Sequence, residues 1–282
     1  MSVKIIIDSA YDLPQELIDR LDVKIMPLLV YVDEIEYEDK KTIEPKEFYE
    51  KMRKGSSVRT AQVSVNTFHD EFIKYVNSND EYLYISFSSG LSGTYQTAEM
   101  VRKELKETYP EFKLKIYDSK CASIGLGLIV DYAVSLAEKG KNVDQIINLI
   151  DAKASRMEHI ITVDDIEYLY RGGRISKSKA LISGVLNIKP IINMEKGELK
   201  LIAKARSKKK AIIKMLDIMD DRGSNISQQT IGIHHGDDWV TAGIVERMIR
   251  ERFGVEKFIV TYAGCVLGAH LGPGAISIFF TS

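Results

Sequence analysis

Short apolar segments alternate with amphipathic segments through the first half of this chain, and this alternation limits its possible folds more than any other feature. Apolar and β-branched runs predict strands at residues 4–7, 23–31, 81–87 and 113–117. Apolar residues at helical spacing predict helices at residues 13–21, 45–53, 66–76, 94–108, 121–139 and 143–157. Because parallel strands need long crossover connections, the alternation predicts βαβ units and a mainly parallel sheet.

The pattern changes after about residue 157. Strands are predicted at residues 160–163, 188–194, 199–205, 230–234, 257–262 and 275–280, with a hairpin turn at 196–198 and helices at 207–220 and 239–253. Hairpin and crossover connections together favour a mixed sheet. We therefore predict a two-domain α/β protein: an N-terminal three-layer α/β domain (1–157) with a mainly parallel sheet, and a C-terminal α/β domain (158–282) with a mixed sheet.

Charge and cysteine content narrow the function classes. The formal net charge is -1, which argues against nucleic acid as a general partner because a basic field supplies most non-specific affinity. Cys121 and Cys265 are far apart and have no ligands at metal-binding spacing. We therefore expect a cytoplasmic protein with two reduced thiols and no bound metal.

The last 25 residues raise the question of a membrane segment, because residues 258–282 contain no Asp, Glu, Lys or Arg. Their length alone permits a membrane span. Four glycines and Pro273 interrupt the middle of the segment, however. We therefore expect two buried strands around a glycine turn and no transmembrane segment.

Hydroxyl and glycine residues are concentrated where a predicted strand meets a predicted helix, in the stretch YISFSSGLSGTYQTA (84–98). A helix that begins near Gly93 leaves its first N–H groups unpaired, and Ser92 is placed to cap it. Such a junction suits a carboxylate or a phosphate. An ordinary Ser cap is the alternative. The stretch has neither the Gly-Lys-Ser/Thr ending of a Walker A loop nor the spacing of a nucleophile elbow.

Three further groups of residues could contact an anion or a partner. His270 lies in GAHLGPG (268–274), where it could donate a hydrogen bond to a carboxylate, bind it as a cation, or simply bond to backbone. Arg171 and Arg174 flank two glycines, which suits convergence on an anion but also fits solvated surface charge. The basic run at 206–210 is either a solvated helix face or a docking patch for an acidic partner.

Two Asp-Ser pairs follow apolar runs, at Asp8-Ser9 and Asp118-Ser119. Such pairs cap the next helix or line a cleft at the carboxyl edge of a sheet. We expect capping for both pairs.

Taken together, six segments resemble the DegV family: IIIDSAYDLP, RTAQVS, SSGLSGTYQTA, DSKCASIGLG, LYRGGRIS and AHLGPGAI. They occur in the order typical of that family, and the resemblance runs from residue 4 to residue 280. The resemblance implies a two-domain α/β fold that binds one long-chain fatty acid between its domains. Some members present the lipid carboxylate to a separate ATP-dependent subunit of bacterial fatty-acid kinase, which makes an acyl-phosphate.

The resemblance also implies roles for particular residues. Thr60 and Ser92 would hold the fatty-acid carboxylate through their hydroxyls, with Gly93 at the adjacent helix start and His270 close to the same head group. Arg171 and Arg174 become candidates for partner docking or phosphotransfer. One departure concerns the usual TSQPSP segment, which is TAQVSV here, so that the loop beside the head group lacks both prolines.

Our leading hypothesis is therefore a fatty-acid carrier that needs no cofactor and is not catalytic by itself. Residues Ile124, Leu126, Leu128, Ile129, Phe279 and Phe280 could line a lipid tunnel or belong to the ordinary core. One alternative is a serine hydrolase that uses Ser92 and His270 with Asp8 or Asp118. Another is a binding protein for some other small carboxylate.

Overall fold

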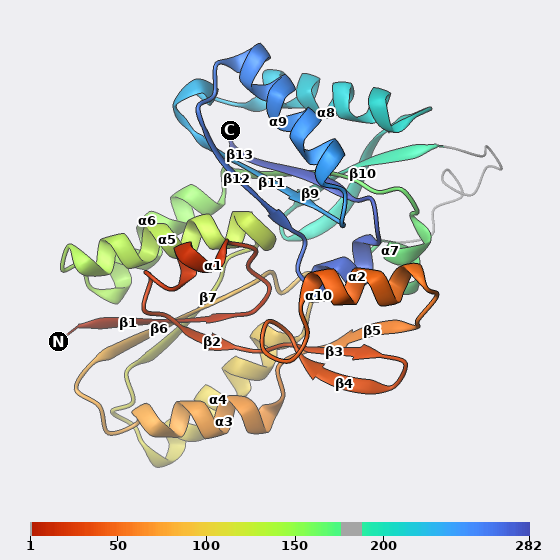
Figure 1. Cartoon of the computed structure of the whole chain (residues 1–282). Helices are drawn as coiled ribbons and strands as arrows, with labels where there is room; N and C mark the ends of the chain where they lie inside the picture. The colour runs from red at the N-terminus through yellow and green to blue at the C-terminus, as the bar shows by residue number, and fades with distance from the viewer. Residues whose placement is uncertain (1, 176–187) are drawn as a thin grey trace.

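The computed structural model describes residues 2–175 and 188–282. Its first sheet is parallel, with strand order β2-β1-β6-β7 (Figure 1). These strands are β1 (Val3–Asp8), β2 (Lys24–Met26), β6 (Glu81–Ser86) and β7 (Leu114–Asp118). Two helices cover one face, α3 (Val65–Phe72) and α4 (Thr94–Thr108), and two cover the other, α5 (Ser123–Glu138) and α6 (Val143–Ala154). The predicted parallel α/β arrangement of this half is confirmed.

The second sheet has the order β10-β9-β8-β13-β11-β12, in which only β11 and β12 are parallel neighbours. Its strands are β8 (Met157–Thr162), β9 (Lys189–Glu195), β10 (Glu198–Ala205), β11 (Thr230–His235), β12 (Lys257–Tyr262) and β13 (Ile276–Thr281). Helices α8 (Lys208–Arg222) and α9 (Trp239–Phe253) cover its outer face. The predicted mixed sheet is therefore confirmed.

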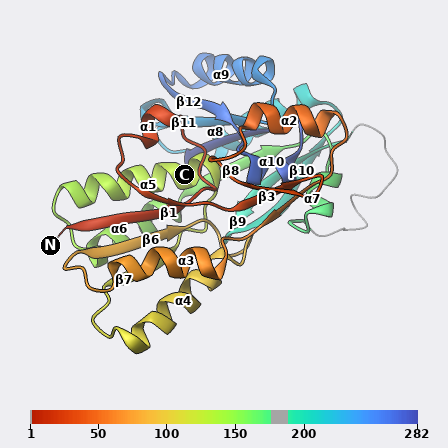
Figure 2. The ribbon, with the colours of Figure 1, turned by 60° about the horizontal axis from the view of Figure 1, so that its bottom comes forward.

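Helix α5 joins the two halves of the molecule. It contacts β1 of the first sheet and β8, β11 and β13 of the second (Figures 1 and 2). The core of the first half also includes Val266, Ala269 and Phe279 from the end of the chain. The second sheet begins at Met157, next to the proposed domain boundary, and the division into domains 1–157 and 158–282 stays a prediction.

A small antiparallel sheet, in the order β4-β3-β5, was not predicted. It contains β3 (Leu29–Val32), β4 (Ile35–Glu38) and β5 (Val58–Ala61). The single strand predicted at 23–31 is wrong, because Pro27 separates β2 from β3 and the two strands join different sheets. Proline has no N–H to donate to a strand ladder, so the pairing stops there.

The strands predicted at 257–262 and 275–280 are present as β12 and β13, but the glycine turn expected between them is wrong. A helix, α10 (Cys265–Leu271), lies between β12 and β13 and contacts α2 (Pro45–Arg53), β3 and β5. A Cβ at Gly268 would lie 2.5 Å from the Tyr49 hydroxyl, so glycine permits this close approach to α2. Over the described ranges, no helix is long and apolar enough to cross a membrane.

The remaining helical elements are short. The helix predicted at 13–21 is reduced to α1 (Gln15–Ile18), and α7 (Glu167–Arg171) was not predicted. The helix predicted at 66–76 becomes α3 followed by a 3-10 turn, η1 (Ile73–Tyr75), and a second such turn is η2 (Ile226–Gln228). Where a capping side chain is present, the helix starts match the predictions closely: Asn142 caps α6, Ser207 caps α8 and Asp238 caps α9.

Candidate functional site

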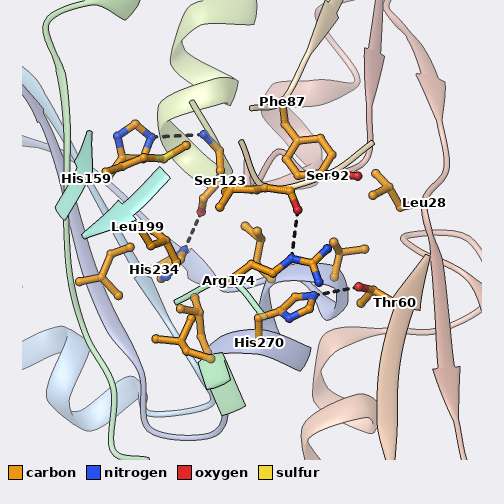
Figure 3. Close-up of a pocket in the computed structure, with 18 of the residues that line it drawn as sticks. Leu28, Thr60, Phe87, Ser92, Ser123, His159, Arg174, Leu199, His234 and His270 are labelled. Carbon is orange, nitrogen blue, oxygen red and sulfur yellow. Dashed lines mark hydrogen bonds between the residues drawn. The ribbon is translucent and has the colours of Figure 1, made fainter. Parts of the chain in front are cut away.

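An apolar pocket lies between the two halves of the molecule (Figure 3). The small sheet, the turn before α4, and the start of α5 contribute one part of its wall, and β8, β9, β10 and α10 contribute the other. Its apolar lining residues are Leu28, Ala61, Phe87, Leu91, Ala122, Ile161, Leu169, Met194, Leu199, Val266, Leu267, Leu271 and Phe279. A pocket with this lining suits a ligand with a long apolar portion.

Three residues predicted from distant segments, Thr60, Ser92 and His270, line this one pocket. Thr60 comes from β5, Ser92 from the turn before α4, and His270 from the last turn of α10. The Thr60 Oγ1 and His270 Nε2 atoms are 2.8 Å apart and form a hydrogen bond. We call the part of the pocket around Thr60, Ser92 and His270 the Thr60 end.

His270 lies on a helix rather than on the tightly turned backbone that its glycine-rich neighbourhood predicted. Burial, together with the nearby Arg174 guanidinium, lowers the pKa of His270 to about 3. The imidazole is therefore neutral at physiological pH and can donate one hydrogen bond, but it does not bind an anion as a cation. Its buried Nδ1 atom has no hydrogen-bond partner in the part of the chain that the structure describes.

Ser92 is not the N-cap residue of the helix that follows it. Gly93 is the N-cap of α4, and the Ser92 Oγ atom accepts a hydrogen bond from the Thr94 N–H at 3.2 Å and lies 2.9 Å from Thr94 Oγ1. A Cβ at Gly93 would lie 2.2 Å from Gln62 Oε1, so a larger residue here would displace the Gln62 side chain. Gln62, which was not predicted, lines the pocket here and donates to Thr97 Oγ1 at 2.6 Å.

The two predicted arginines lie in different places. Arg174 lines the pocket at the Thr60 end, and its Nε donates to the Leu91 carbonyl at 3.0 Å. Arg171 is exposed and stacks on the Tyr168 ring at 4.7 Å, within an adjoining surface cavity that Thr60, Arg174 and His270 also border. Ser176, the last residue of that predicted motif, lies outside the described residues.

The opposite end of the pocket contains polar residues that the sequence did not single out as binding residues, namely Ser123, His159 and His234 (Figure 3). We call it the Ser123 end. Ser123 has a φ of 56°, in the left-handed region. Its Oγ atom lies 2.6 Å from His234 Nδ1 and donates to Asp12 Oδ2 at 2.7 Å. In the sequence His234 stands beside His235, and nothing local connects it to Ser123.

Of the residues suggested for a lipid tunnel, some line the pocket and others belong to the core. Phe279 lines the pocket, whereas Phe280 belongs to the core beneath α8 and α9. Ile124, Leu126 and Ile129 are buried core residues, and Leu128 packs against the same core. The basic run at 206–210 is mainly exposed, except that Lys208 pairs with Asp238 at 2.7 Å and with Asp164 at 3.0 Å.

The aspartates predicted as helix caps tie strand ends to loops instead. Asp8 Oδ2 accepts hydrogen bonds from the Phe87 N–H at 2.8 Å and the Tyr84 hydroxyl at 2.9 Å, and burial raises its pKa to about 6. Asp118 Oδ1 accepts from the Ser89 N–H at 3.1 Å. Neither aspartate lines the pocket.

The hydrolase alternative needs Ser92, His270 and an aspartate in contact. Among the described residues, Ser92 bonds with Thr94, and His270 bonds with Thr60. Asp8 and Asp118 make their bonds to other partners. This geometry therefore provides no support for a catalytic triad at Ser92.

Comparisons with known proteins agree on one family. A family model described as "Uncharacterised protein, DegV family" matches residues 2–282. A DegV domain-containing protein of Clostridium perfringens is 38% identical over 276 residues, which cover 97% of this chain and 95% of the relative. One from Caldanaerobacter subterraneus is 34% identical over 278 residues, covering 99% of this chain and 98% of the relative.

Solved structures of similar proteins have the same fold. A Thermus thermophilus protein, described as a fatty-acid-binding DegV family protein, superimposes with a TM-score of 0.87 at 27% identity and covers 100% of both chains. A stearic-acid-binding protein of Eubacterium ventriosum gives 0.89 at 27% identity, over 99% of this chain and 98% of that one. DegV of Bacillus subtilis, a fatty acid binding protein, gives 0.88 at 25% identity, over 100% and 99%.

Proposed function

The chain belongs to the DegV family, and on that premise we propose that it binds a long-chain fatty acid in its interior pocket and presents the carboxylate to a partner kinase. The observation that carries this proposal is the composition of the pocket. Its wall is apolar over most of its extent, and Thr60, Ser92 and His270 are gathered at one end. The fatty-acid ligands of the solved relatives support the same assignment.

Tail burial supplies most of the binding free energy in this proposal. About fifteen buried methylenes at ~0.8 kcal/mol each give roughly 12 kcal/mol before ordering costs. Lost translational and rotational freedom removes several kcal/mol of this, which still leaves tight binding. The apolar wall is therefore the main source of affinity, and the head group sets the direction in which the lipid enters.

The carboxylate would receive hydrogen bonds from neutral donors, the hydroxyls of Thr60 and Ser92. The imidazole of His270 would donate its Nε2 proton to Thr60 Oγ1, which leaves the Thr60 proton free for the carboxylate. Arg174 adds positive charge nearby, but it already donates to the Leu91 and Gly172 carbonyls. Neutral donors leave more electron density on a carboxylate than a bidentate arginine pair does. This suits a carboxylate that must act as a nucleophile.

In the second part of the proposal, a separate ATP-dependent kinase phosphorylates the presented acid. One carboxylate oxygen attacks the γ-phosphorus of ATP, the bond from that phosphorus to the bridging oxygen breaks, and the products are an acyl-phosphate and ADP. The chain itself would contribute binding and orientation and no cofactor. The cytoplasm is the proposed compartment, because the partner needs ATP. Arg171, exposed at the surface cavity beside His270, is the proposed contact with that partner.

Mass spectrometry of ligand extracted from the purified protein tests the first part. We expect one or more long-chain fatty acids at close to one per chain. Stable protein that is repeatedly empty, and that does not take up added hexadecanoate, would rule the binding function out. Competition between hexadecanoate and small carboxylates then separates a lipid carrier from a binding protein for some other acid.

Hydroxylamine trapping of acyl-phosphate tests the second part, with loaded protein, ATP and a candidate kinase. Formation of a fatty hydroxamate that Arg171→Ala reduces, without any change in lipid affinity, is the expected result. Lipid binding without trapped product from any candidate kinase would leave a carrier that does not present its lipid for phosphorylation.

A further inference from the structure

Polar side chains around the Ser123 end form a continuous chain of hydrogen bonds. Ser277 Oγ lies 2.6 Å from His234 Nε2, and His234 Nδ1 lies 2.6 Å from Ser123 Oγ. Ser123 Oγ then donates to Asp12 Oδ2 at 2.7 Å. All four side chains are buried. The chain therefore crosses the interior from β13 through β11 and α5 to the loop after β1.

Hydrogen counting fixes the direction of this chain. The Ser123 proton goes to the Asp12 carboxylate, which can only accept. His234 Nδ1 must then donate to Ser123 Oγ, and His234 Nε2 is already paired with the Ser277 hydroxyl. The second oxygen of Asp12 accepts from the Gly264 N–H at 3.0 Å and from Lys40 Nζ at 3.2 Å. No proton of Ser123 or His234 is left to donate to a ligand.

His159, the third polar residue of this end, is occupied in the same way. Its Nε2 accepts from the Ala122 N–H at 3.3 Å, and its Nδ1 donates to the Met157 carbonyl at 3.2 Å. Burial lowers the pKa of His159 to about 4, so the ring is neutral. The rings of His159 and His234 both stand edge-on to Phe279, at 5.3 and 5.2 Å. A ligand at this end therefore meets carbon atoms and hydrogen-bonding groups that are already satisfied.

We propose that the Ser123 end selects fatty acids with an unsubstituted hydrocarbon tail and excludes acids with a hydroxyl on the distal part of the chain, and that Ser123 determines this selectivity. The inference rests on the proposed function, because it assumes that the carboxylate lies at the Thr60 end. A hydroxyl at the Ser123 end would lose its water without finding a free donor. Removal of the Ser123 side chain takes this partner away from His234 Nδ1 and Asp12 Oδ2. A ligand hydroxyl could then accept from His234 Nδ1 and donate to Asp12.

Dissociation constants for two pairs of acids test the proposal: hexadecanoate with its ω-hydroxy derivative, and octadecanoate with a derivative hydroxylated in mid-chain. We expect the wild-type protein to bind the parent acid of at least one pair roughly 10- to 100-fold more tightly, the range of selectivity that one hydroxyl produces in an apolar site. Ser123→Gly should reduce that ratio about tenfold. Glycine is the appropriate replacement because Ser123 has a positive φ, which glycine adopts without strain.

Ser277→Ala is the matched control. Ser277 bonds to the other nitrogen of His234 but does not line the pocket, so the wild-type ratio should persist. The ratio separates selectivity from simple destabilisation, because a destabilised pocket loses affinity for both acids. If Ser123→Gly does not fold, the wild-type ratio still decides whether hydroxylated acids are excluded.

Four results would overturn the inference. Wild-type ratios within about threefold of one for both pairs would show that the Ser123 end does not exclude hydroxyls. An unchanged ratio in folded Ser123→Gly, or an equal loss in Ser277→Ala, would remove the role of Ser123. Failure of the wild-type protein to bind any of the four acids would instead contradict the proposed function, and this inference with it.

Discussion

The two ends of the pocket contain similar side chains, but they differ in how many of the hydrogen bonds of these side chains are made within the protein. At the Thr60 end, His270 Nδ1 is buried without a partner in the described ranges, while Thr60 bonds with His270 and Ser92 bonds with Thr94. At the Ser123 end, Ser123 and His234 find all their partners within the protein. A histidine or serine in a pocket wall thus indicates a polar ligand only where its hydrogen bonds are not already made. We expect the following four experiments to separate the two ends.

The largest effect is expected from the double variant Thr60→Val with Ser92→Ala. Each hydroxyl would lose a hydrogen bond to a charged carboxylate, which contributes about 1.5–3 kcal/mol. Affinity for hexadecanoate should therefore fall by roughly a hundredfold or more, as measured by calorimetry. The control is Thr162→Val with Ser277→Ala, which removes two buried hydroxyls that do not line the pocket. Equal losses in the two double variants would erase the proposed difference between the ends.

Two glycine substitutions compare how firmly each end is held. A Cβ at Gly125 would lie 2.5 Å from His159 Nε2, and one at Gly172 would lie 2.1 Å from His270 Nδ1. His159 is fixed by two hydrogen bonds, so Gly125→Ala should lower the free energy of unfolding by about 1–3 kcal/mol.

His270 is held by a single side-chain hydrogen bond, to Thr60, so Gly172→Ala should displace the ring. We expect Gly172→Ala to cause a smaller loss of stability and a greater loss of lipid affinity than Gly125→Ala. Denaturant unfolding and lipid titration of both variants measure the two quantities. The opposite order of effects would mean that the Ser123 end is the more adaptable one.

The third experiment shortens the pocket at the Ser123 end. Ala122 lines the pocket there, and its N–H bonds to His159. Ala122→Leu adds three carbons where the tail is expected to lie, so affinity for octadecanoate should fall by roughly tenfold. Decanoate, whose shorter tail is expected to end before this position, serves as the control ligand and should bind as before. A greater loss for decanoate would indicate that the head group lies at the Ser123 end.

The smallest effect concerns the titration of the two imidazoles. The depressed pKa of His270, about 3, means that its neutral form contributes stability that is present above pH 6.5 and is lost as the pH falls toward 3. A carboxylate at the Thr60 end should raise the pKa of His270 by about one unit, since a nearby negative charge favours the protonated form.

The pKa of His159, about 4, should not change when the lipid binds. Nuclear magnetic resonance titration of both rings, with and without hexadecanoate, measures the difference. An equal shift of the two rings, or a shift of His159 alone, would contradict the proposed orientation of the ligand.

Much of the fold could be predicted from local pattern. Strands and helices that alternate along the first half identified the parallel sheet, and capping residues fixed where α6, α8 and α9 begin. The errors occur where tertiary contacts outweigh local preference. Helix α10 forms in a glycine-rich segment because the segment packs closely against α2, and the chain leaves the first sheet at Pro27, after β2.

By itself, the sequence determined the class of fold and the family resemblance, and it singled out Thr60, Ser92 and His270 in the pocket wall, because these depend on neighbours along the chain and on short motifs. Only the tertiary structure decided which polar groups have partners, since those partners are distant in sequence. Thr60 and His270 are 210 positions apart, and Ser123 and His234 are 111 apart. The difference between the two ends of the pocket arises from such contacts, because a hydrogen bond depends on the positions of two atoms in space and not on their order in the chain.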